Sequence, residues 1–164
     1  DVHLDTSRLG VHGLRRAIVE RFGGDRLDKL RIEVLSFSFK SGVPREADLV
    51  FDVRFLRNPH WEPTLQPLTG LDPSVQDFIR EDARFETFRT RLEALLEFLV
   101  PAYGDEGKSY LTIAFGCTGG KHRSVFLAEI VAAWLAARGF APAVRHREQG
   151  LERVLRPAAA EATS

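Results

Sequence analysis

One segment of the sequence constrains the fold more than any other, because an apolar run, a glycine-rich loop and a second apolar run follow each other directly. It reads SYLTIAFGCTGGKHRSV, residues 109–125. The run from Ser109 to Phe115 is almost wholly apolar, which is typical of a strand buried in a parallel sheet. The following run, residues 124–139, predicts a helix that ends at Gly139. Strand, glycine loop and helix in this order indicate an α/β domain.

The other predicted elements belong to the same class. Residues 30–39 and 47–55 are rich in β-branched and aromatic residues and predict strands, and 142–147 predicts a further short strand. A short helix is predicted over 74–79. A longer helix ends at Pro101, and one face of it is lined by Phe85, Phe88, Leu92, Leu95, Leu96 and Leu99. We therefore predict an α/β fold with a mostly parallel sheet and flanking helices.

The pattern changes at both ends of the chain. Residues 1–28 predict a linker or N-terminal helical arm, whose helix is stopped by Gly23 and Gly24. Residues 29–150 form the predicted domain, and 151–164 predict a disordered tail with too few large apolar groups to pack. The numbered chain begins with Asp1 and contains no Met. We therefore expect a fragment of a longer protein.

Composition limits the classes of function. The 164 residues include 23 basic and 23 acidic side chains, so nucleic-acid binding would have to be local. The single cysteine cannot form an internal disulfide, and no signal peptide or membrane-length apolar run is visible. We expect a soluble cytoplasmic protein.

The glycine loop is the strongest candidate for a binding site. In α/β sheets ligands bind beyond the carboxyl ends of the strands, and basic and imidazole groups gather there in KSG, RFLRNPH, GCTGGKHR and RHRE. Backbone N–H groups and the dipole of the following helix attract an anion to such a loop. Thr118, Lys121 and Arg123 add donors, while Gly119 and Gly120 permit a close backbone approach. The alternative is a tight turn whose basic side chains face water.

Neighbouring loops extend the candidate site. Asp52 and Arg54 would share a strand face and either pair with each other or contact a ligand, and Asn58 and His60 lie in the proline-rich loop 57–73. The candidate ligand-binding residues are Asp52, Arg54, Asn58, His60, Thr118, Gly119, Gly120, Lys121, His122 and Arg123. A candidate RNA-binding set comprises Lys40, Arg145, His146 and Arg147.

Other chemistries have weaker support. Cys117 and Arg123 form the C-x5-R pattern of cysteine-dependent phosphatases, but Gly116 stands where that family usually has His. We favour a buried, inert cysteine over a nucleophile, although the phosphatase stays an alternative. Zinc-ligand spacings are absent, so we predict no metal site. Because we interpret Cys117 as inert, we also predict no catalytic residue. For Trp61 we favour loop packing over a stacking role.

Several separated motifs together carry a specific resemblance. FDVRFLRNPHW, LTGLD, SYLTIAFGCTGGKHRSV and VRHRE, in this order, resemble the C-terminal domain of the RapZ/YvcJ family, whose N-terminal half is a P-loop nucleotide-binding domain. The similarity extends from LDTSRLGVHGLRRAI to about Glu148. It would also account for the missing Met and for the absent GxxxxGK[ST] pattern.

The resemblance implies a regulatory domain rather than an enzyme. It implies that the domain binds a small regulatory RNA, presents it to an endoribonuclease and senses glucosamine-6-phosphate. It also implies a fold similar to part of phosphofructokinase and a tetrameric protein. The implied pocket residues are His60, Thr118, Gly119 and Arg123. The resemblance implies no cofactor for this domain. It implies binding and weak hydrolysis of ATP or GTP only for the N-terminal domain. The basic C-terminal cluster of RNA-binding members is reduced here to Arg153 and Arg156, which implies weaker RNA binding.

Overall fold

The centre of the domain is a five-stranded sheet with the strand order β2-β3-β1-β4-β5. The computed structural model describes residues 30–157. The strands are β1 (Arg31–Ser38), β2 (Leu49–Asp52), β3 (Tyr110–Cys117), β4 (Ala143–His146) and β5 (Leu151–Val154). β1 pairs in parallel with β3 and β4, and β2 pairs in parallel with β3, whereas β5 is antiparallel to β4. The predicted α/β class with a mostly parallel sheet is confirmed.

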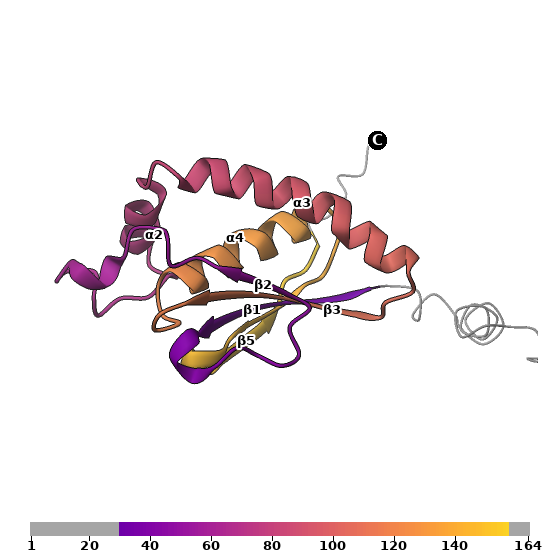
Figure 1. The fold of residues 1–164 in the computed structure, drawn as a ribbon, viewed down its shortest axis with the longest axis horizontal. Coiled ribbons are helices and arrows are strands. Elements are labelled where there is room, and N and C mark those ends of the chain that lie inside the picture. Colours follow the sequence, from indigo (N-terminus) through magenta and orange to yellow (C-terminus); the bar gives the residue numbers. More distant parts are fainter. Residues whose placement is uncertain (1–29, 158–164) are drawn as a thin grey trace, which may run out of the picture.

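Three helices of the described residues lie on the same side of this sheet (Figure 1). They are α2 (Pro73–Arg80), α3 (Phe85–Asp105) and α4 (Arg123–Ala137). α4 contacts β1, β3 and β4, and most of its side chains are buried because the sheet and α3 cover different sides of it. Phe126 of α4 stacks on Phe85 of α3, with ring centroids 5.6 Å apart. This buried helix fixes the position of the glycine loop that precedes it.

The opposite face of the sheet has a smaller apolar cluster. Leu35 and Phe37 of β1 and Ala114 of β3 form it, and Phe39 and Ala47 pack against it. The covering chain runs from the 3-10 turn η1 (Phe39–Ser41) to the start of β2. One face therefore carries helices and the other carries irregular chain.

The long helix differs from its prediction, since α3 continues through Pro101 to Asp105. Pro101 is exposed, while the buried stripe of Leu92, Leu96 and Val100 leads on to Tyr103, which packs against the core. Packing of this stripe outweighs the loss of one backbone hydrogen bond at proline. The helix ends instead at Asp105, two residues before Gly107, which has a φ of 86°. Leu95, predicted on the packed face, is exposed.

The strand β5 also differs from its prediction, because Leu151–Val154 were assigned to a disordered tail. All four side chains are exposed, so no apolar alternation marks the strand. Its order comes from the ladder to β4 and from an ion pair between Arg153 and Glu129 of α4. The predicted N-terminal arm and residues 158–164 of the predicted tail lie outside the described residues. Within residues 30–157, no helix combines the length and the apolar character needed to cross a membrane.

Candidate functional site

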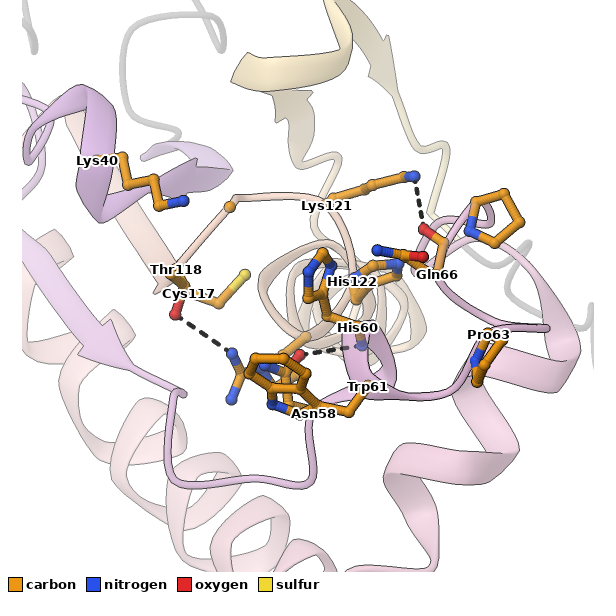
Figure 2. Close-up of a pocket in the computed structure, with 13 residues that line it drawn as sticks. Lys40, Asn58, His60, Trp61, Pro63, Gln66, Cys117, Thr118, Lys121 and His122 are labelled. Atoms are coloured by element: carbon orange, nitrogen blue, oxygen red, sulfur yellow. Dashed lines mark hydrogen bonds between the residues drawn. The ribbon is translucent and has the colours of Figure 1, made fainter.

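The loops after β1, β2 and β3 meet at one pocket of about 890 Å³ (Figure 2). Its volume lies within the range of small-molecule sites. The lining side chains are mostly basic, imidazole or amide groups, and no carboxylate is among them. They are Lys40, Asn58, His60, Trp61, Pro63, Gln66, Pro67, Cys117, Thr118, Gly119, Lys121, His122 and Arg123.

Arg123 is the first residue of α4 and is only 4% exposed. Its Nη1 donates to the carbonyl oxygens of Arg54 at 2.6 Å and Leu56 at 3.0 Å, and its Nη2 lies 3.5 Å from Thr118 Oγ1. Its Nε has no hydrogen-bond partner among the described residues. Burial lowers the pKa of Arg123, and the guanidinium lies at the positive end of the helix dipole. A bound anion beside Arg123 would offset both the burial of its charge and the repulsion from the helix dipole.

His122 is the residue before α4, and its side chain is not used to cap the helix. Its ring is 6% exposed, and Nε2 has no hydrogen-bond partner in the described part of the chain. Burial and the neighbouring charge of Lys121 lower the pKa of His122, although nearby carbonyls of Leu68 and Gln66 act in the opposite direction. The ring therefore keeps a buried polar nitrogen without a protein partner next to the pocket.

The proline-rich loop is joined to the glycine loop by close backbone contact. Gly70 N donates to Lys121 O at 2.9 Å, and Lys121 Nζ donates to Gln66 O at 2.8 Å. A Cβ atom on Gly70 would lie 2.2 Å from His122 O and 2.6 Å from Phe126 N. The LTGLD motif thus needs a glycine at this position, because the loop lies directly on the first turn of α4.

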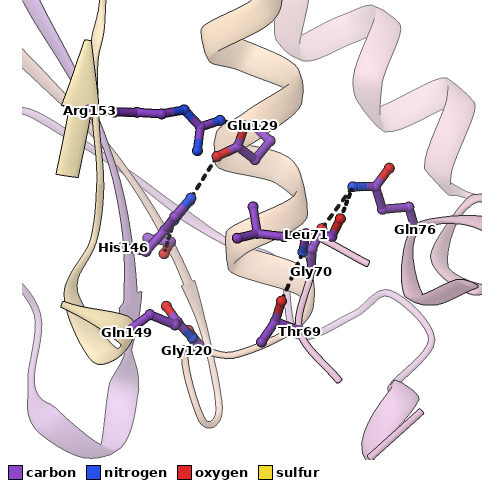
Figure 3. Close-up of polar contacts among 10 residues, drawn as sticks. Thr69, Gly70, Leu71, Gln76, Gly120, Glu129, His146, Gln149 and Arg153 are labelled. Carbon is purple, nitrogen blue, oxygen red and sulfur yellow. Dashed lines mark hydrogen bonds and ion pairs between the residues drawn. The ribbon is translucent and has the colours of Figure 1, made fainter. Parts of the chain in front are cut away.

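The turn after β4 contacts the glycine loop from the other side (Figure 3). This turn is η3 (Arg147–Gln149), and Gln149 Nε2 donates to Gly120 O at 3.1 Å. Gly120 has a φ of 63°, and a Cβ on it would lie 2.8 Å from both Glu148 Oε2 and Ser38 N. Gly120 is therefore required for the turn, and it does not line the pocket.

Asp52 and Arg54 also lie outside the pocket lining. They make a bidentate ion pair with a shortest distance of 2.6 Å, and the Arg54 guanidinium lies 4.1 Å from the Phe39 ring centroid. The side-chain hydrogen bond from Arg54 lowers the pKa of Asp52. The sequence left open whether Asp52 and Arg54 pair with each other or contact a ligand, and in the structure they pair with each other. Arg54 serves the site through its backbone carbonyl, which accepts from Arg123.

The 3-10 turn η2 (Pro59–Trp61) and the residue before it bring three side chains to the pocket, which are Asn58, His60 and Trp61. Asn58 precedes it, and its Oδ1 accepts from His60 N at 3.2 Å. Asn58 and His60 were expected here, whereas Trp61, Gln66 and the two prolines Pro63 and Pro67 were missed. Four prolines in residues 57–73 marked the loop as functional, but its pattern does not tell which side chains face inward.

The candidate RNA-binding residues are not brought together as one basic surface. Lys40 lines the pocket. Arg145 pairs with Glu33 and Glu46, and Arg147 donates to the carbonyls of Ser38 and Gly42.

His146 belongs to an internal chain of polar contacts, shown in part in Figure 3. It is 1% exposed, with its Nδ1 2.8 Å from Ser36 Oγ and its Nε2 2.7 Å from Glu129 Oε1. Burial alone would raise the pKa of Glu129, but the contacts with His146 and Arg153 outweigh it and the net shift is downward. In this arrangement His146 holds β1, β4 and α4 together and is closed to an RNA phosphate.

Cys117 is buried at the end of β3, with Sγ 3.1 Å from Ser124 Oγ. A Cβ atom on the preceding Gly116 would lie 2.5 Å from ring atoms of Phe37 and Phe39. The histidine usual at this position in cysteine-dependent phosphatases therefore has no space here. Across residues 30–157, no three His, Cys, Asp or Glu side chains are grouped so that they could hold a metal ion.

Fold and site together define a small α/β domain with a basic pocket beyond the carboxyl ends of its parallel strands. Residues 30–150 match the family model described as the RapZ C-terminal domain. The chain therefore belongs to the RapZ family and contains its C-terminal domain, which confirms the resemblance found in the sequence.

Curated relatives support this assignment. A protein from Rhodospirillum rubrum named a nucleotide-binding protein is 57% identical over 145 residues, which cover 88% of this chain and 46% of that protein. Proteins with the same designation from Jannaschia sp. and Rhodospirillum centenum are each 51% identical over 148 residues, or 90% of this chain, and 46% and 45% of those proteins. The chain spans about half the length of these relatives.

The contact at Gly70 can be tested by adding a single methyl group. We expect Gly70→Ala to destabilise the domain by about 2 kcal/mol, because the two nearest atoms that it would meet are backbone atoms of His122 and of Phe126 in α4, which cannot move separately. The measurement is urea unfolding. Gly119→Ala is the matched control, since its added Cβ would meet nothing within 4 Å, and we expect it to stay within about 0.5 kcal/mol of wild type. Equal stabilities for the two variants would contradict this account.

Proposed function

We propose that this domain is a regulatory module that binds a phosphorylated amino sugar, glucosamine-6-phosphate, in the pocket. The observation that carries the proposal is the buried guanidinium of Arg123 at the positive end of α4, on the wall of a pocket without a carboxylate. The unpartnered atoms Arg123 Nε and His122 Nε2 add to it. A dianionic phosphate would balance the charge of Arg123 and accept hydrogen bonds from its guanidinium.

The two ends of the ligand require different partners. Arg123, the Thr118 hydroxyl and the backbone at Gly119 suit the phosphoryl oxygens, because they combine charge, a donor and close approach. Asn58, His60 and Gln66 suit sugar hydroxyls, since they line the same pocket and offer neutral donors and acceptors. The four residues that the family resemblance implies, His60, Thr118, Gly119 and Arg123, all line this pocket.

Nucleotide binding, which the names of the relatives mention, we assign to the half of those proteins that this chain does not span. The GxxxxGK[ST] pattern of a P-loop is absent from the chain. In the whole protein, the proposed role of the present domain is to bind the metabolite and thereby sense its concentration.

Titration calorimetry with glucosamine-6-phosphate tests the pocket. We expect Thr118→Val and Gly119→Ala to weaken binding about tenfold, since each removes or blocks one phosphate contact, and Arg123→Lys to weaken it further. Arg138→Ala, at the other end of α4, is the control for loss of a positive charge and should bind as wild type does. Unchanged affinity in all three pocket variants would place the ligand elsewhere.

We further propose that RNA contacts this domain weakly and at the pocket rim. Lys40 favours this location, because it is exposed and, unlike Arg145, has no ion-pair partner among the described residues. A phosphate group of the RNA at Lys40 would lie beside the proposed ligand. Presentation of the RNA to an endoribonuclease is the corresponding proposal for the whole protein.

A gel-shift titration with a structured RNA at physiological salt tests the RNA proposal. We expect half-saturation at micromolar protein, because few cations are free to contact phosphates. Lys40→Ala should weaken binding several-fold, whereas the exposed Arg91→Ala on α3 should not. The proposal fails if no shift occurs at micromolar protein, or if both variants behave alike.

The phosphatase alternative has its own test. We expect no hydrolysis of p-nitrophenyl phosphate, because Cys117 is buried and hydrogen-bonded to Ser124. We also expect Cys117→Ser to bind glucosamine-6-phosphate within about threefold of wild type, since a hydroxyl replaces a thiol of similar size. Hydrolysis by wild type that disappears in Cys117→Ser would instead establish a thiolate nucleophile.

A further inference from the structure

Trp61 has an unusual position for a large aromatic residue. Its side chain is 77% exposed, the largest exposed fraction among the large apolar residues of the described chain, and yet it lines the pocket. The packing role favoured from the sequence is therefore wrong. An indole left in water forgoes the stabilisation that burial of its large apolar surface would give.

The backbone, rather than packing of the indole, holds Trp61 at the rim. The turn η2 begins with the buried Pro59, which restricts the backbone angle φ. Asn58 caps the turn through His60 N, and Trp61 N donates to Asn58 O at 3.4 Å. The His60 ring meets the indole edge to face, with centroids 5.4 Å apart and planes at 75°. The indole is thus presented at the pocket by a turn that is ordered without it.

The charges around the pocket leave a ligand cation few partners. The lining contains Lys40, Lys121 and Arg123, and the imidazoles of His60 and His122, with no Asp or Glu. A phosphate therefore meets favourable groups, while an ammonium group on the same ligand meets no carboxylate. Trp61 is the largest π surface in this lining, and the face of an indole attracts cations through its quadrupole.

We propose that Trp61 determines specificity at this pocket by taking the ammonium group of the phosphorylated amino sugar on its indole face. The proposal rests on the proposed function, since it requires the phosphate of the same ligand to lie on the glycine loop. In this proposal Arg123 binds the phosphate group, and Trp61 selects an amine over a hydroxyl on the sugar.

Two ligands and two substitutions test the proposal. Calorimetry compares glucosamine-6-phosphate with glucose-6-phosphate, which has a hydroxyl in place of the amine, for wild type, Trp61→Phe and Trp61→Leu. We expect wild type to prefer the amino sugar, Trp61→Leu to lose about fivefold in affinity for it, and glucose-6-phosphate to change less than twofold. Trp61→Phe should be intermediate, because phenyl is a weaker cation partner than indole. Phe98→Leu, at a similarly exposed aromatic residue on α3, is the control and should change neither affinity.

The outcomes are distinguishable. If Trp61→Leu weakens both sugars equally, the indole makes a contact without selectivity, and the proposal is overturned. If neither affinity changes, Trp61 does not touch the ligand, and it is overturned as well. If wild type binds neither sugar phosphate, the proposed function itself fails, and the specificity role of Trp61 fails with it.

Discussion

The candidate site depends on the buried positive charge of Arg123, which lies at the positive end of a helix. Arg123 is buried and begins α4, so its guanidinium faces both a loss of hydration and the positive end of a helix. Its described hydrogen bonds go to neutral oxygens, two of them carbonyls of the chain after β2. Those bonds join the chain after β2 to the start of α4 at the wall of the pocket.

The other contacts around the pocket keep this arrangement rigid. Gly70 lies on the first turn of α4, Lys121 reaches back to Gln66, and Gln149 bonds the carbonyl of Gly120. Ser38 at the end of β1 adds a hydrogen bond to Thr118 O at 2.7 Å. Loops that follow four different parallel strands are thus joined to one another, which pre-organises the pocket for a ligand.

The sequence was most informative where one pattern implies one structure. The apolar run of β3, the glycine pair and the apolar run of α4 identify an α/β domain and point to the loop that lines its basic pocket. The sequence failed where tertiary contact overrides local pattern. Pro101 reads as a helix end but lies on the exposed side of a packed helix, and β5 has no apolar alternation because it is ordered by an edge ladder.

Side-chain directions in loops were equally beyond the sequence. From the sequence, Asp52 and Arg54 could contact either a ligand or each other. In the structure β2 ends at Asp52, and the two side chains form an ion pair. Gly120 was predicted to allow approach of an anion, but it serves the contact with Glu148 and Ser38. We predicted a packing role for Trp61 because most tryptophan side chains are packed. The sequence around it does not reveal that the turn leaves the indole in water.

The exposed indole also gives the domain a built-in spectroscopic reporter. The chain has two tryptophans, and Trp134 is partly buried in α4 beneath the guanidinium of Arg138. Its surroundings do not include the pocket, so its emission provides a constant background. Trp61 emits from a solvated position at the pocket rim, and any ligand that displaces water there alters its wavelength and its access to a quencher. Occupancy can therefore be followed in the unlabelled protein.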